Sequence, residues 1–121
     1  MVASDRSRQL GPALEAAYRF VLWLVPTVEK FPKSQKFLIG DRIQSTALDV
    51  MERLIEATYN KRRGRMLEDA NLGIEKLRFL FRLSKDLKLL DMRRYEHAAR
   101  ELDEVGRLIG GWRKADHAAQ T

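Results

Sequence analysis

The 121-residue sequence contains no cysteine, so neither disulfides nor thiolate-bound metals hold the fold together. Its longest apolar run, around Phe20 to Val25, stops at Pro26 and is far shorter than the roughly 20 residues that span a bilayer. The start, residues 1–10, is polar and lacks the apolar core of a signal peptide. We therefore expect a cytoplasmic protein.

The sequence also lacks the motifs of common enzyme classes. His97 and His117 do not belong to a pair at metal-ligand spacing, such as His-Glu-x-x-His. The Glu-x-x-His motif of di-iron helical bundles does not occur, and neither do a P-loop and Gly-x-Gly-x-x-Gly. We therefore predict a protein with no catalytic residues, no metal site and no cofactor.

The remaining composition is that of a folded protein, with 45% hydrophobic and 33% charged residues. Apolar residues recur at steps of three and four, and no segment alternates like a strand. This pattern predicts an all-α fold, an up-down-up-down four-helix bundle in one domain over residues 12–114. Its helices are expected at about 12–30, 34–60, 65–90 and 92–114, with flexible tails at 1–11 and 115–121.

Local signals mark several helix ends. Pro12 suits the first turn of a helix, where its missing N–H costs nothing. Pro26 lies inside the same helical pattern, so we expect a kink or a shift of the core face there. Ser34 and Asp91 are expected to cap the second and fourth helices through their side-chain oxygens.

The third helix has more apolar surface than one bundle needs. Its apolar arc covers roughly 200°, whereas a bundle helix needs only about 100°. The excess predicts a second contact surface, and we expect Phe79, Leu83 and Leu87 to lie in an oligomer interface.

Glycines are unexpected near the end of the fourth helix. Gly106 and Gly110 lie four residues apart and would form a groove that lets another helix approach closely. Packing within the chain and contact between subunits are both compatible with this groove. We place Gly106, Gly110 and the anchor Trp112 in the predicted oligomer interface.

The net charge of +6 and the pI near 9.9 are typical of proteins that bind nucleic acids or other polyanions. Residues 61–90 carry much of the excess, with nine Lys and Arg against four Asp and Glu. Two groups of cations are candidate nucleic-acid-binding residues. They are Lys61, Arg62, Arg63 and Arg65 in the turn before the third helix, and Arg78, Arg82 and Lys85 on one side of it.

A further basic stripe recurs every seven residues on the fourth helix, at Arg93, Arg100, Arg107 and Lys114. One interpretation is a track for phosphates. The other is a solvated face that Glu96, Asp103 and Glu104 neutralise at helical spacing, and the presence of these carboxylates favours it.

The order of several motifs resembles the accessory variability determinant (Avd) family of diversity-generating retroelements. Phe31-Pro32-Lys33-Ser34, followed by Phe37, Gly40, Arg42 and Ile43, is one part of the likeness. The most specific part is the closing Gly106-Arg107-Leu108-Ile109-Gly110-Gly111-Trp112. The resemblance covers roughly residues 12–114.

The resemblance implies a four-helix bundle that assembles as a barrel-like homopentamer and has no catalysis of its own. Avd-like proteins bind the retroelement reverse transcriptase and its template RNA or cDNA, and so support mutagenic retrohoming. Two alternatives stay open. One is a bundle of the type encoded in 23S rRNA intervening sequences, which fits less well at the Gly110-Gly111-Trp112 end, and the other is a purely protein-binding scaffold.

Overall fold

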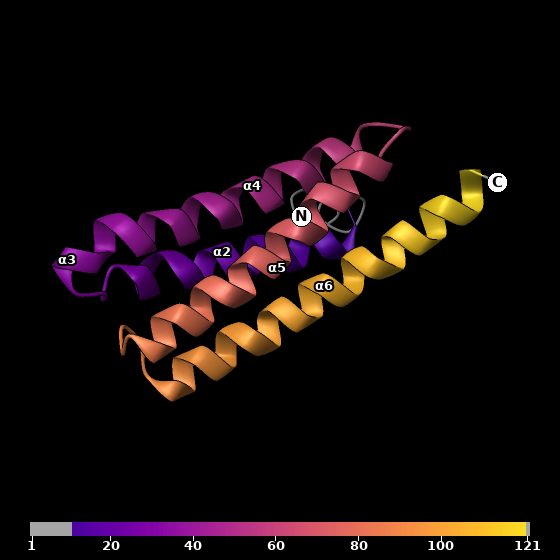
Figure 1. The fold of residues 1–121 in the computed structure, drawn as a ribbon. Helices are drawn as coiled ribbons and strands as arrows, with labels where there is room; N and C mark the ends of the chain where they lie inside the picture. The colour runs from indigo at the N-terminus through magenta and orange to yellow at the C-terminus, as the bar shows by residue number, and fades with distance from the viewer. Residues whose placement is uncertain (1–10, 121) are drawn as a thin grey trace, which may run out of the picture.

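The computed structural model describes residues 11–120, which fold into a bundle of four long helices (Figure 1). Successive long helices run in opposite directions, as the all-α up-down-up-down prediction requires. Helix α2 packs against α4 and α6, and α5 packs against the same two helices. Their bounds are α2 Pro12–Val28, α4 Asp41–Thr58, α5 Gly64–Asp86 and α6 Met92–Gln120.

The core consists of the apolar face of each long helix. Leu24, Leu54, Phe81 and Leu102 are among its fully buried side chains, one from each helix. The buried Ser84 hydroxyl donates a hydrogen bond to the Leu80 carbonyl at 2.8 Å, so it carries no unpaired polar group into the core. No described helix is long and apolar enough to cross a membrane.

Helix α2 begins with Pro12 at its first position, as predicted, and ends two residues before the expected boundary. The helix continues through Pro26, whose ring nitrogen cannot donate to the carbonyl four residues earlier. The hydroxyl of Thr27, the next residue, donates a hydrogen bond to the Trp23 carbonyl at 2.8 Å. This side-chain bond connects adjacent turns of the helix at the point where Pro26 removes a backbone hydrogen bond.

The predicted second helix is divided. A short helical turn, α3 Lys33–Gln35, leads into the π-helical turn η1 Lys36–Gly40 and then into α4. Ser34 does not cap it, because the turn already begins at Pro32, whose carbonyl accepts hydrogen bonds from the Gln35 and Lys36 amides at 2.9 Å. Gly40 packs so closely on α2 that a Cβ there would lie 2.7 Å from Cγ1 of Val28.

The Asp91 prediction is confirmed. Its Oδ1 accepts a hydrogen bond from the Arg94 amide at 2.8 Å, which is the geometry of a helix N-cap. Before it, α5 stops at Asp86 rather than near Leu90, and the chain turns through Lys88 with φ of 63°.

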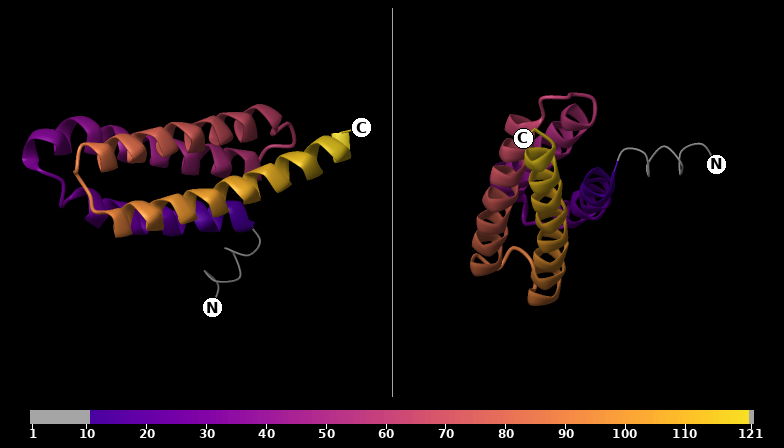
Figure 2. Two further views of the ribbon diagram at one scale, coloured as in Figure 1. Left: turned by 60° about the horizontal axis from the view of Figure 1, so that its bottom comes forward. Right: turned by 90° about the vertical axis from the view of Figure 1, so that its right-hand side faces the viewer.

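Helix α6 extends six residues past its expected end at 114 (Figure 2). Residues 115–120, predicted as part of a flexible tail, are helical in the structure. They contain three alanines and neither glycine nor proline, so their own propensity favours helix where the apolar pattern has stopped. The predicted N-terminal tail, apart from Gly11, lies outside the described residues.

Candidate nucleic-acid interface

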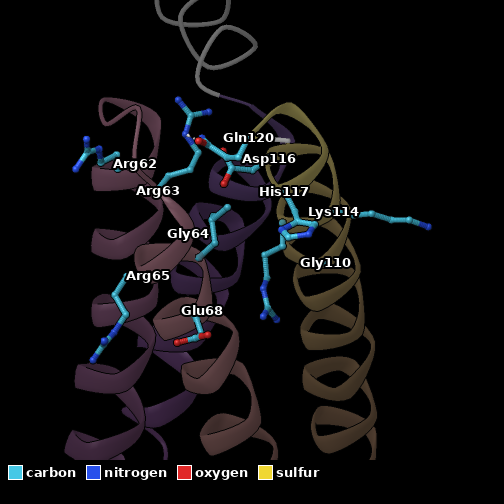
Figure 3. A pocket seen from close by; sticks show the side chains of 12 residues that line it. Arg62, Arg63, Gly64, Arg65, Glu68, Gly110, Lys114, Asp116, His117 and Gln120 are labelled. Carbon is cyan, nitrogen blue, oxygen red and sulfur yellow. Dashed lines mark ion pairs between the residues drawn. The ribbon is translucent and has the colours of Figure 1, made fainter.

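The α4–α5 turn and the C-terminal end of α6 line a hollow of about 810 Å³ (Figure 3). We call it the Arg62 hollow. Five of its side chains are Lys or Arg and two are Glu or Asp, so the surface is positively charged. Its lining residues are Arg62, Arg63, Gly64, Arg65, Leu67, Glu68, Gly110, Arg113, Lys114, Asp116, His117 and Gln120.

Arg63 connects the two sides of this hollow. Its Nε donates to the Asn60 carbonyl at 2.9 Å and lies 3.9 Å from Oδ1 of Asp116 on α6. Its guanidinium carbon also lies 5.8 Å from the centroid of the Trp112 ring, a cation–π distance. Arg63 is therefore engaged in holding α6 against the turn, although the sequence suggested a free phosphate contact.

The other turn cations are more open. The Arg62 amide donates to Oδ1 of Asn60 at 3.1 Å, which fixes the turn and leaves the guanidinium exposed. Arg65 is 82% exposed, and its Nε lies 3.3 Å from Oδ1 of Asp69. Among the described residues, Lys61 and Arg62 form no ion pair. Figure 3 shows Arg62 and Arg65 pointing away from α6, whereas Arg63 reaches towards it.

Helix α6 adds side chains that the sequence analysis did not assign to this site. Arg113, Lys114 and His117 are exposed and line the hollow opposite the turn. Lys114 was considered only as part of a stripe, and His117 was placed in a tail. The missing step was the helical continuation of residues 115–120, whose alanine content was the available signal.

Arg78, the first cation of the second predicted group, is already paired. Its Nη1 donates to Oδ1 of Asp103 on α6, and its Nε lies 3.4 Å from Oε2 of Glu75. The hydrogen bond to Asp103, with support from Glu75, raises the pKa of the Arg78 guanidinium above its ordinary value. Arg78 thus joins α5 to α6 as a permanent cation.

Arg82 and Lys85 differ from Arg78 in their surroundings. Arg82 is exposed and forms no ion pair with the residues described. It lines a hollow of about 250 Å³ between α5 and α6, beside Phe79 and Tyr95. The Lys85 ammonium lies 4.8 Å from the centroid of the Tyr95 ring and 3.6 Å from Oδ1 of Asp86. The three predicted cations therefore share one side of α5, and Arg82 is the most open of them.

The heptad stripe on α6 does not behave as one unit. Arg107 bonds to Glu104 through two nitrogens, as the neutralised-face interpretation expects. Asp103, one of the expected neutralisers, bonds instead to Arg78. Arg93 and Arg100 are exposed and make no ion pair with described residues, so the favoured interpretation is right for only part of the stripe.

The apolar residues predicted for an oligomer interface lie on the outer side of α5. Phe79 is 67% exposed, Leu83 44% and Leu87 50%. Sequence reasoning missed two further exposed apolar rows. They are Tyr18, Leu22 and Val25 on α2, and Leu48 and Ile55 on α4 with Tyr59 just after it.

The glycine groove and Trp112 have contacts within the chain. A Cβ on Gly106 would lie 3.2 Å from Nη2 of Arg78 and 3.6 Å from Cγ2 of Ile74, so this glycine makes room for α5. Gly110 has open space around its Cα and lines the Arg62 hollow. Trp112 packs partly on the core beneath Arg63. Packing within the chain thus explains Gly106 and Trp112, whereas Gly110 remains open.

The described residues contain no group of three or more His, Cys, Asp or Glu side chains placed to hold a metal ion. Comparison with curated proteins gives no match. A family model described as bAvd-like, in contrast, matches residues 13–115, which is most of the chain. The protein therefore belongs to the bAvd-like family.

Proposed function

We propose that this protein is a non-catalytic accessory factor of a diversity-generating retroelement. In this role it acts in the cytoplasm as a homo-oligomer, and the family resemblance favours a pentamer. It binds template RNA or cDNA and docks the retroelement reverse transcriptase, and so supports mutagenic retrohoming. Membership of the bAvd-like family supports the accessory role.

The observation that carries the nucleic-acid part of the proposal is the Arg62 hollow. Arg62, Arg113 and Lys114 line it without an ion pair to any described residue, and Lys61, next to Arg62 in the turn, is exposed and also unpaired among the residues described. Cations that are not already neutralised can release the counterions of a nucleic-acid backbone when they bind phosphates. The lining of the hollow comes from the α4–α5 turn and from α6, so cations from two separate elements are available to one nucleic acid.

The exposed apolar rows support self-assembly and protein docking. Without a bound partner, the large apolar side chains of Phe79 and Leu83 on α5 and of Leu22 on α2 stay exposed to water. Rows on different helices of one protomer allow a head-to-tail contact, which closes into a ring when the rotation permits. A row that assembly leaves uncovered is available to the reverse transcriptase.

The test is a charge reversal at the two open sides of the hollow, Arg62→Glu with Lys114→Glu. A matched control reverses Arg42 and Lys76, which are exposed, lie outside the hollow and change the net charge equally. The first variant should lose RNA affinity at least tenfold more than the control, because it removes two phosphate contacts. Each lost contact should also reduce the slope of log K against log[salt] by about 0.7 for single-stranded RNA.

Equal affinities for the two variants would remove the hollow from the nucleic-acid site. If the unmodified protein retained no RNA yet bound a protein partner without dependence on salt, the purely protein-binding scaffold would be the better description. The exposed apolar rows are the observation that favours this second candidate.

A further inference from the structure

A second group of cations lies at the other end of the bundle. Two adjoining hollows of about 440 Å³ and 480 Å³ open where α2 ends, α5 turns and α6 begins. They share Thr27, Lys30, Asp91 and Arg94. Together they include six cations, namely Lys30, Lys85, Lys88, Arg93, Arg94 and Arg100. We call this region the Lys88 surface.

Most of these cations are available to an anion. Two acids at this end are already paired, Asp91 with Arg94 at 2.8 Å and Asp86 with Lys85 at 3.6 Å, and Glu96 on α6 makes no ion pair with the residues described. Glu29, beside Lys30, pairs with Lys36 at 2.8 Å. The four remaining cations of the surface make no ion pair with the residues described. They are Lys30, Lys88, Arg93 and Arg100.

Lys88 has an unfavourable backbone conformation, which suggests that its side chain is needed there. The Leu89 amide donates to the Ser84 carbonyl at 2.8 Å and the Lys88 amide to the Lys85 carbonyl at 2.9 Å. This pattern is a Schellman motif, whose left-handed residue is usually glycine. Lys88 occupies that position with φ of 63°, although a side chain there costs stability. Strain retained at a surface position is a reason to look for function.

Between the two ends, two of the arginines are already paired. Arg78 bonds to Asp103, and Arg107 bonds to Glu104, both near the middle of α6. Helix α5 has 23 residues, so its ends lie about 35 Å apart at 1.5 Å per residue. The unpaired cations of the Lys88 surface therefore form a group separate from the Arg62 hollow, with Arg82 and Lys76 as open cations on α5 between them.

We propose that the Lys88 surface is a second phosphate-binding surface, which contacts the nucleic acid at the end of the bundle opposite the Arg62 hollow. The inference rests on the proposed nucleic-acid binding and assigns a new part of the protein to it. The ligand chemistry is a double-helical phosphate backbone, since the cations lie along helix ends and a turn rather than around a pocket for a base. A duplex of 20 base pairs, about 68 Å long at 3.4 Å per pair, is long enough to reach both ends.

The first test uses the full-length protein and a 20-base-pair DNA duplex. Lys30→Glu with Arg93→Glu should weaken binding at least tenfold relative to the Arg42→Glu, Lys76→Glu control. The salt slope of log K should fall by about 1.8, because each lost duplex contact removes about 0.9. Light scattering should give the same mass for both variants, which separates lost contacts from lost assembly.

The second test uses the strain at Lys88. Lys88→Gly should raise Tm, because glycine adopts this backbone without cost, and yet weaken duplex binding roughly fivefold, since it removes about one phosphate contact. Lys88→Arg should retain the affinity and the salt slope of the unmodified protein. A change that stabilises the fold while weakening binding cannot be attributed to unfolding.

The outcomes separate the two proposals. If the unmodified protein does not bind duplex or RNA at low salt, the proposed function fails. If it binds, and the Arg62→Glu, Lys114→Glu variant is weakened while the Lys30→Glu, Arg93→Glu and Lys88→Gly variants match the control, the second surface alone is refuted.

Discussion

The guanidinium of Arg63 lies over the indole of Trp112, with 5.8 Å between the Arg63 Cζ and the ring centroid. The same guanidinium faces Asp116 one turn further along α6. Gln120 adds a hydrogen bond from its Nε2 to the Lys61 carbonyl at 3.4 Å. The α4–α5 turn thus holds the end of α6 in place, and the cations on that end keep their position relative to those of the turn.

Trp112→Ala should lower the free energy of unfolding by about 2 kcal/mol. The estimate is below the range for a fully buried tryptophan because the ring is only partly buried, and it includes the cation–π contact. Urea denaturation followed by circular dichroism measures the loss. Trp112→Phe, which keeps an aromatic face for Arg63, should lose about half as much, and equal losses for the two variants would contradict the stacking role.

Two glycine variants should have opposite effects on stability. Gly73→Ala places a Cβ in steric conflict with Cγ2 of Val50, where α5 meets α4, and should cost about 1–3 kcal/mol through overpacking. Gly110→Ala meets no atom within 4 Å and should stabilise α6 by up to about 1 kcal/mol. Thermal unfolding distinguishes the two.

The Gly110 variant also tests the predicted oligomer interface. A neighbouring helix packed closely on Gly110 would clash with the new methyl group, so the oligomer should weaken if the prediction is right. Light scattering of Gly110→Ala therefore decides the point. An unchanged oligomer mass with increased stability would exclude Gly110 from the interface.

Replacing the exposed apolar row of α5 by polar residues should reduce the oligomer mass. Phe79→Ser with Leu83→Ser removes apolar side chains that are 67% and 44% exposed, so the protomer itself should stay folded. Light scattering and circular dichroism report the two properties separately. Phe79→Leu with Leu83→Ile, which keeps the row apolar, is the control. A species of 14.1 kDa for the unmodified protein would refute assembly altogether.

Asp103→Asn should destabilise the protein only slightly, by about 0.5 kcal/mol, because the pair that it breaks lies near the surface. The Asp103 bond raises the pKa of Arg78, so Arg78 contributes its stabilisation below its ordinary pKa and loses it only at still higher pH. The loss measured at pH 6 and at pH 9 should therefore be the same. A loss that differed strongly between them would point to another titrating partner.

Much of the fold could be predicted because the apolar period is regular. Leu54, Phe81 and Leu102 lie in the core, because apolar residues at steps of three and four share one face of a helix, and Asp91 caps α6 as its position suggested. Boundaries were less predictable. The apolar pattern stops at Trp112, whereas the helix continues to Gln120. Beyond Trp112 the length of the helix depends on backbone propensity and on contacts with the α4–α5 turn, which the apolar pattern does not report.

The candidate site was predicted in part. A sequence shows that Arg62 and Arg63 are adjacent. It does not show that Arg63 pairs with Asp116 and stacks on Trp112, while Arg62 makes no ion pair with the residues described. The sequence pattern assigned no role to Lys88. Its proposed role depends on the left-handed turn after α5 and on the position of Lys30, which is far from it in the chain.

The most direct test of nucleic-acid binding is the affinity of the unmodified protein for RNA between about 50 mM and about 200 mM KCl. Three unpaired cations that line the Arg62 hollow predict a slope near −2.1 for single strands, which is a loss of roughly 20-fold over this range. Affinity that stays the same across the range, or no RNA binding at the lowest salt, would contradict the account.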